Sequence, residues 1–423
     1  MLRTISLAAF VCLSISSLTL AADWPQWAGP DRDFNAGDAD LADRWPAEGP
    51  RQLWARDLGV GYSGIVVADG TLYTMYRKSR TDAVEYTVAL DAATGKTIWE
   101  FEHPAPLAGP PAEPSDSRWG GQGPNATPLI VGDRLYTMGS RAVMHCHDRK
   151  SGKVLWTRDL AEEFGATHAG RKNNDTGYPP SPVAYKNSVI VPLGRSRVGE
   201  SEPGRSLVAL DQADGRVLWK GLDFECGFAS PRLIVLGDQD QLVLQTKGDL
   251  IGVDPGDGSL LWRHPMNSDW DPTASPVWNR GSGVLVKDGE NASMVELTVR
   301  DGKTTPRESW SSPKLDVLVS TPVLIGETFY GATKSMLVAV NATTGEHLWT
   351  ERGFPMASII HADGKLILLD ENGQLTLATA SPEGLTIRSQ GTVTEKYSLT
   401  APALVGAKLF VRDRKQIVAL DLG

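Results

Sequence analysis

Short apolar runs separated by polar turns recur along the whole chain. From residue 127, "TPLIVGDRLYT" has a small residue and a proline, an apolar run, a Gly-Asp turn and a second apolar run. Segments with the same order begin at residues 63, 181, 230, 275, 321, 358 and 401. Apolar runs of this length between turn residues are typical of buried β-strands. These openers predict eight repeated units of four strands.

A second repeated pattern follows most of these openers. "LDAATGKTIWE" at residues 90–100 reads as a strand end, a tight turn and a new strand, and close copies begin at 147, 210, 253 and 340. Asp or Asn can hydrogen-bond the backbone two residues on, and Gly takes the positive φ that closes a hairpin. Units five and seven depart from the pattern. Gly302 and Gly384 keep the turn, but Trp310 is displaced and Arg388 stands where a tryptophan is expected.

The two ends of the chain complement each other. The final "IVALDLG" stops before its turn and tryptophan, whereas "RQLWARDL" near the N-terminus, with Trp54, supplies an outer strand that has no unit of its own. A circular sheet arrangement needs such closure to remove open edges. We therefore predict an all-β, eight-bladed β-propeller of four-stranded antiparallel blades, closed by an N-terminal strand. It spans residues 52–423 as one domain, after an N-terminal extension at 23–51.

The repeated tryptophans favour a structural role. Each ring can pack over the small residue of a neighbouring blade and bury about 200 Å². The position of Ala89 is accordingly small in the better copies, and Cys146 fills it in the second. A ring of blades has many such joints and usually one active site, so we expect docking rather than catalysis from these residues: Trp54, Trp99, Trp156, Trp219, Trp262 and Trp349.

Residues 1–22 read as an export signal, with Arg3 before a short apolar run and small residues at the end. No cysteine stands at the expected cleavage point to carry a lipid, so we expect a soluble exported protein, periplasmic or extracellular. The net charge of −9 argues against nucleic acid and anionic membranes as partners. Cys146 and Cys226, the cysteines beyond the signal, are too few for a disulfide scaffold or a cysteine metal cluster.

Long loops give the main functional signal. Segments 104–123 and 161–179, with "RKSRTDA" and "RSRVGESEPGR", all fall on one face of the predicted ring, around blades one to three. Long loops on a rigid scaffold are where binding usually occurs, although tolerated insertions without function would look the same. The ligand or partner-binding candidates on this face are Trp119, Gln122, Asn125, His168, Arg171, Lys172, Asn173, Asp175, Glu225, Trp270 and Asp271.

The pattern Ala-x-Asp-x-x-Thr-Gly-x-x-x-Trp, complete from Ala89 to Trp99, resembles the tryptophan-docking motif of the quinoprotein, or PQQ-like, β-propellers. The resemblance implies the propeller fold. That family contains both PQQ-dependent dehydrogenases and non-catalytic assembly factors of the BamB type. The segment "DWPQWAGPDRDF" also resembles one that opens many exported bacterial members, with Ala28 where an arginine is common.

The resemblance leaves two functions open. A PQQ dehydrogenase is expected to show an adjacent cysteine pair, calcium-binding Glu, Asn and Asp residues and a catalytic aspartate, whereas Cys146 and Cys226 lie far apart. Acidic residues near Glu225 and Asp271 could bind Ca²⁺, yet they form no compact loop of alternating ligands. We favour an exported, monomeric, non-catalytic scaffold without cofactor or metal, which binds a protein or another envelope macromolecule. The alternative is a PQQ- and Ca²⁺-dependent quinoprotein that oxidises an alcohol or sugar.

Overall fold

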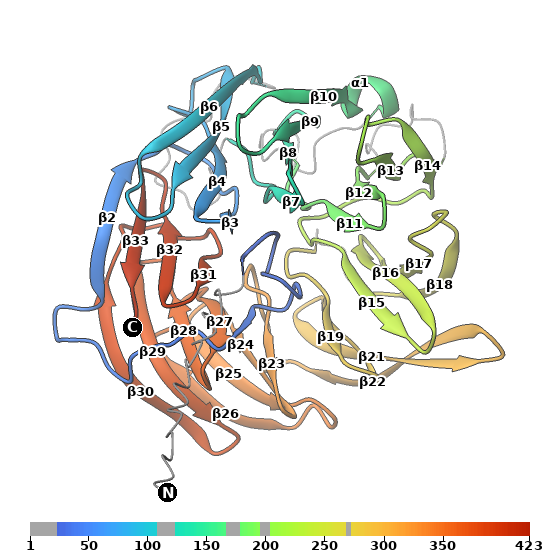
Figure 1. Ribbon diagram of the computed structural model, residues 1–423. Coiled ribbons are helices and arrows are strands. Elements are labelled where there is room, and N and C mark those ends of the chain that lie inside the picture. Colours follow the sequence, from blue (N-terminus) through green and yellow to red (C-terminus); the bar gives the residue numbers. More distant parts are fainter. Residues whose placement is uncertain (1–22, 108–122, 166–177, 195–203, 268–271) are drawn as a thin grey trace, which may run out of the picture.

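The described strands form eight sheets around a common axis. The computed structural model describes residues 23–107, 123–165, 178–194, 204–267 and 272–423 of the chain. Consecutive strands within each sheet pair antiparallel, and the sheets follow one another around a ring (Figure 1). The predicted eight-bladed all-β propeller is therefore confirmed.

The first four blades follow the chain from the inner to the outer strand. Blade one holds β3 (Val66–Ala68), β4 (Thr71–Tyr76), β5 (Val84–Asp91) and β6 (Thr97–Pro104). Blade two holds β7 (Leu129–Val131), β8 (Arg134–Met138), β9 (Val143–Asp148) and β10 (Val154–Asp159). Blade three holds β11 (Val183–Tyr185), β12 (Ser188–Pro192), β13 (Leu207–Asp211) and β14 (Val217–Gly221). Blade four holds β15 (Arg232–Leu236), β16 (Gln239–Thr246), β17 (Asp249–Val253) and β18 (Leu260–Pro265).

The remaining blades repeat this order. Blade five holds β19 (Val277–Asn279), β20 (Gly283–Asp288), β21 (Asn291–Arg300) and β22 (Lys303–Ser312). Blade six holds β23 (Val323–Ile325), β24 (Thr328–Ala332), β25 (Met336–Asn341) and β26 (His347–Arg352). Blade seven holds β27 (Ser358–Ala362), β28 (Lys365–Leu369), β29 (Gln374–Ser381) and β30 (Gly384–Thr392). Blade eight holds β31 (Ala403–Val405), β32 (Lys408–Arg412) and β33 (Gln416–Asp421), with β2 (Arg51–Asp57) as its outer strand.

The ring closes as the sequence predicts. Strand β2 pairs antiparallel with β33, with Trp54 opposite Ala419 and Arg51 opposite Asp421. Arg51 and Asp421 also form an ion pair at this joint. In Figure 1 the blue β2 lies directly beside the red β33. The two ends of the chain thus share one sheet.

Two elements depart from the regular plan. Strand β1 (Asn35–Gly37) pairs parallel with β27 and gives blade seven a fifth strand at its inner edge. Helix α1 (Leu160–Phe164) begins the link after blade two, and the carboxylate of Asp159 caps it by accepting from the amide of Glu162. The repeat pattern carried no signal for β1, because that strand lies in the N-terminal extension, outside the repeats.

The joint between blades is a tryptophan ring on a turn glycine. Trp99 of blade one covers Gly152 of blade two, where an added Cβ would lie 2.6 Å from the ring. The indole Nε1 of Trp99 donates to the carbonyl of Arg149 in the same turn, at 2.9 Å. Gly152 has a φ of +74°, which L side chains rarely adopt. The same contact joins Trp54 to Gly95, Trp156 to Gly215, Trp219 to Gly258 and Trp310 to Gly345.

This geometry revises the expected docking surface. The small residue at the position of Ala89 lies directly opposite Trp99 on the adjacent strand of the same blade, so its small side chain makes room for the indole ring. The residue that the ring covers in the neighbouring blade is instead the turn glycine. Trp310 makes the same contact although its sequence position is displaced, because β21 and β22 form a longer hairpin in blade five.

Three joints remain. After blade six, Nε1 of Trp349 donates to the carbonyl of Ser381 in blade seven at 2.8 Å. The extended hairpin and the N-terminal extension alter the other two. Trp262 of blade four is buried and its Nε1 donates to Oε1 of Gln241 at 2.7 Å, while Gln241 donates to Thr304 of blade five. Blade seven has Arg388 in place of a tryptophan. Trp45 from the extension is buried beside that strand, and its amide donates to the hydroxyl of Ser389.

Hydroxyl side chains join the inner ends of successive blades. The amide of Thr127 donates to Oγ of Ser181 at 3.0 Å, and the amide of Ser181 donates to Oγ of Ser230 at 3.0 Å. The amide of Ser230 donates to Oγ of Ser275, which in turn donates from its amide to Oγ1 of Thr321. These residues are the small ones before the prolines of the repeated openers. Their hydroxyl oxygens accept hydrogen bonds from buried backbone amides that have no partner within a β-sheet.

We predict that Gly152→Ala destabilises the protein more than Gly132→Ala. Both glycines have positive φ and share that backbone cost, but nothing lies within 4 Å of a Cβ at Gly132. At Gly152 the methyl group would push Trp99 out of its seat, at an additional cost of about 1–3 kcal/mol. Urea unfolding followed by tryptophan fluorescence measures both variants. Equal shifts of the unfolding midpoint would contradict a docking role for Trp99.

Candidate functional site

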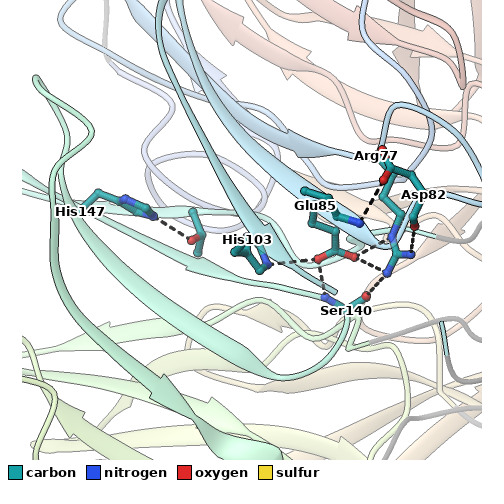
Figure 2. A network of polar contacts seen from close by, with 8 residues as sticks. Arg77, Asp82, Glu85, His103, Ser140 and His147 are labelled. Carbon is teal, nitrogen blue, oxygen red and sulfur yellow. Dashed lines mark hydrogen bonds and ion pairs between the residues drawn. The ribbon is translucent and has the colours of Figure 1, made fainter. Parts of the chain in front are cut away.

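A buried network of charged and polar side chains lies between blades one and two (Figure 2). Arg77 follows β4 and Glu85 lies in β5, and both side chains are almost completely buried. Nε and Nη2 of Arg77 both donate to Oε1 of Glu85 at 3.0 Å, and Nη1 donates to the carbonyl of Asp82 at 2.7 Å. The arginine therefore fixes the base of the β4–β5 loop.

The network continues into blade two. Nη2 of Arg77 donates to Oγ of Ser140 at 2.9 Å, and the amide of Ser140 donates to Oε2 of Glu85 at 2.9 Å. Nε2 of His103, at the end of β6, lies 3.6 Å from the same carboxylate oxygen. Burial alone would raise the pKa of Glu85, but the contacts with His103, Arg77 and Ser140 outweigh it and hold this pKa below its ordinary value.

Three histidine rings extend the network from His103 in β6 to His145 and His147 in β9. The rings of His103 and His145 are 4.7 Å apart, those of His145 and His147 are 5.8 Å apart, and Phe101 packs edge-on against the last two. Burial lowers the pKa of His145 to about 3 and that of His147 to about 4. Nε2 of His147 lies 3.3 Å from the hydroxyl of Thr137. The imidazoles of His145 and His147 are therefore neutral at pH 7, and all three rings pack as part of the joint between the blades.

The chemistry open to this network is limited by its burial. The Glu85 carboxylate is surrounded by donors from Arg77 and Ser140 and is closed to solvent. Within the described parts of the chain, no three His, Cys, Asp or Glu side chains are arranged to hold a metal ion. The network thus anchors the β4–β5 loop to blade two at the loop-bearing end of the blades.

The N-terminal segment occupies the centre of the ring, where the dark blue trace crosses in Figure 1. Trp24 exchanges two backbone hydrogen bonds of 2.9 Å with Val67 of blade one. The carbonyl of Pro25 accepts from Ile130 of blade two, and the carbonyl of Phe34 accepts from His361 of blade seven. The hollow beside this segment, lined by residues that include Trp24, Trp27, Gly64, Thr127 and Pro402, has no room for a water molecule.

The sequence-predicted binding residues are only partly described. Asn125 lies in the link before blade two and Glu225 in the link before blade four, so they belong to separate joints. The carboxylate of Glu225 lies 3.5 Å from Nζ of Lys247. The other candidates lie outside the described residues: Trp119, Gln122, His168, Arg171, Lys172, Asn173, Asp175, Trp270 and Asp271.

Sequence reasoning missed the buried charges. Glu85 stands inside "AVEYTVAL", an otherwise apolar strand, and Arg77 closes the strand before it. A charge within a buried run requires a partner, and this is the signal that could have identified the pair. The export signal at 1–22 lies outside the described residues. In the described part of the chain, no helix has the length and apolar character needed to span a membrane.

We predict that Glu85→Gln destabilises the protein by about 3–5 kcal/mol, because it leaves the buried Arg77 without its counter-charge. Glu296→Gln is the matched control, since it breaks an exposed pair with Arg307 and should cost less than about 1 kcal/mol. Urea unfolding at pH 7 compares the two. Similar midpoints for both variants would show that the buried pair is not coupled to folding.

We also predict that stability falls as pH decreases from about 6.5 toward 4. The folded-state pKa values of His145 and His147, about 3 and 4, are lower than the ordinary value of 6.5, so the unfolded chain binds more protons in this interval. Each histidine contributes a slope of up to about 1.4 kcal/mol per pH unit. His145→Phe should flatten the dependence measured by urea unfolding at several pH values. An unchanged slope would contradict the prediction.

Comparison with known proteins agrees with the repeat pattern. A family profile described as outer membrane protein assembly factor BamB matches residues 85–351. The protein of that name from Yersinia pestis is 23% identical over 298 residues, which span 68% of this chain and 71% of the relative. A quinohemoprotein alcohol dehydrogenase of Comamonas testosteroni is 25% identical over 261 residues, which span 54% of this chain and 33% of the enzyme.

The solved structure of BamB from Moraxella catarrhalis superimposes with a TM-score of 0.60 at 14% identity, covering 88% of this chain and all of that one. At this identity the likeness supports the fold alone. The family profile, in contrast, matches more than half of the chain. The chain therefore belongs to the PQQ-like propeller family described as outer membrane protein assembly factor BamB.

Proposed function

We propose that this protein is an exported scaffold of the cell envelope that binds another protein during outer-membrane assembly, without catalysis and without a cofactor. The family match over residues 85–351 carries this proposal. Relatives from Yersinia pestis and Shewanella oneidensis are named for the same assembly role. The expected partner is a protein of the envelope, and the propeller binds it as a monomer.

The loop-bearing ends of blades one to three form the proposed contact surface. Antiparallel strands place the β4–β5 loop and the links between blades at the same end of the ring, opposite the short turns such as Asp91–Gly95. Arg77 and Glu85 hold the β4–β5 loop to Ser140 of blade two. A loop held this way keeps its shape when a partner approaches, which reduces the ordering cost of binding.

The candidate contact residues of this surface remain those that the sequence singles out. Asn125 and Glu225 lie in links at this end of the ring. Trp119, Arg171 and Trp270 would add the aromatic and arginine side chains that commonly dominate protein interfaces. The filling of the ring centre by Trp24 and its neighbours favours contact through the rim and the loops.

The partial likeness to a quinohemoprotein alcohol dehydrogenase keeps an enzymatic alternative with PQQ and Ca²⁺ in view. The described residues do not fit that pair of groups. Cys146 is buried against Trp156 in blade two and Cys226 lies in the link between blades three and four, so the two do not form an adjacent cysteine pair. Among the described residues, no three His, Cys, Asp or Glu side chains are arranged to hold a metal ion such as Ca²⁺. Titration with PQQ and Ca²⁺, followed by dye reduction with an alcohol, distinguishes this alternative.

We predict that a photo-crosslinking amino acid at Ser79, in the β4–β5 loop, captures an envelope protein in intact cells. The same amino acid at Lys96, in the exposed β5–β6 turn of the opposite face, is the matched control and should capture none. Mass spectrometry of the adducts identifies the partner, and the amounts of folded outer-membrane proteins are compared with and without the gene. Equal adducts at both positions, or unchanged outer-membrane proteins, would contradict the proposal.

A further inference from the structure

Two arginines are buried together in the centre of the ring. Arg32 belongs to the N-terminal segment and Arg232 begins β15 of blade four, and their exposed fractions are 8% and 7%. Nη1 of Arg232 donates to the backbone carbonyl of Arg32. Nη1 of Arg32 donates to Oε1 of Gln26 at 3.1 Å and to the carbonyl of Pro182 in blade three at 3.2 Å. The two guanidinium groups therefore lie between blades three and four.

Several of their donors have no acceptor. Nε and Nη2 of Arg32 and Nε of Arg232 are buried without a hydrogen-bond partner. Arg412, which is also fully buried, leaves only its Nε without an acceptor, because its two terminal nitrogens donate to carbonyls of Gly59, Ser63 and Met75 and to a hydroxyl. A buried guanidinium with open donors is costly, since neither water nor an acceptor replaces its hydration.

Their charges are also incompletely balanced. Burial and the neighbouring Arg232 lower the pKa of Arg32 to about 9, and burial lowers the pKa of Arg232, with Arg280 adding to the effect. Asp31 and Asp33 oppose the lowering at Arg232, but the carboxylate of Asp33 pairs with Arg280 at 3.3 Å. Neither Arg32 nor Arg232 has a carboxylate within ion-pair distance among the described residues.

We propose that Arg32 and Arg232 form a binding site for an oxyanion, the phosphate or carboxylate group of a small molecule, in the centre of the ring. A planar guanidinium presents Nε and one terminal nitrogen as a fork, and Arg32 leaves both of these donors open. Two oxygens of one phosphate or carboxylate match that fork. The negative charge would offset the repulsion between the two arginines and tie blades three and four to the N-terminal segment.

The backbone of Arg32 supports a dedicated position for this side chain. Its φ is +56°, in the left-handed region that non-glycine residues seldom adopt. Two hydrogen bonds hold the segment in this conformation. The amide of Arg32 donates to the carbonyl of Gly29, and the side chain of Arg232 donates to the carbonyl of Arg32. Arg32 and Arg232 are buried, whereas the partner surface is proposed for exposed loops, so variants of either arginine test the anion site without altering those loop residues.

Thermal unfolding of the full chain in phosphate, in acetate and in chloride at matched ionic strength tests the site. Binding to the folded state should raise the Tm of the wild type in phosphate or acetate by at least about 2 °C over chloride. Arg32→Gln and Arg232→Gln should each lose this increase. Arg307→Gln is the matched control, because it removes an exposed arginine of the blade-five hairpin, and it should keep the increase.

Isothermal titration with phosphate and with acetate then identifies the source of the oxyanion, with one site per chain expected for whichever binds. If Arg32→Gln fails to fold, the wild-type protein can be denatured and the released anions measured by ion chromatography. One phosphate or organic acid released per chain would support the site. The proposal is overturned if the wild type shows no Tm preference and releases no stoichiometric anion. It is also overturned if the Arg32 variant folds and keeps the full response.

Discussion

The contact that the rest of the structure depends on is a tryptophan of one blade seated on the turn glycine of the next. A four-stranded blade cannot bury both faces alone, so stability requires that each sheet cover its neighbour. The indole does this and also donates to a carbonyl of the same turn, as Trp99 does at Arg149. Because Trp54 belongs to the last blade and docks on Gly95 of the first, the same contact closes the circle.

The sequence predicted this architecture because the information is local and repeated. An Asp, a Gly and a Trp at fixed spacing determine both the hairpin and the turn glycine on which a neighbouring tryptophan packs. The incomplete final copy of this pattern revealed the closing strand. It misjudged Trp310, since a longer hairpin changes the spacing but not the final position of the ring. Strand β1 and the position of Trp45 could not be predicted, because both depend on contacts between the unrepeated N-terminal extension and the distant blade seven.

The candidate site was less predictable for a related reason. Loop length drew attention to one end of the blades, but it said nothing about what holds those loops. Glu85 could have been suspected from its place in an apolar strand, whereas its partners Arg77, Ser140 and His103 come from two blades and three different turns or strand ends. Only the packing of one blade on another brings them together.

The position of the N-terminal segment links stability to function. Propellers can bind ligands at the ring centre or partners on the rim, and here the centre holds Trp24, Pro25 and Phe34 in backbone contact with three blades. A partner would therefore meet the loop ends rather than an open channel. The cost of this arrangement is a pair of buried arginines, Arg32 and Arg232. Their open donors make the ring centre a place for a small oxyanion that stabilises the fold, while the loops remain free to contact a macromolecule.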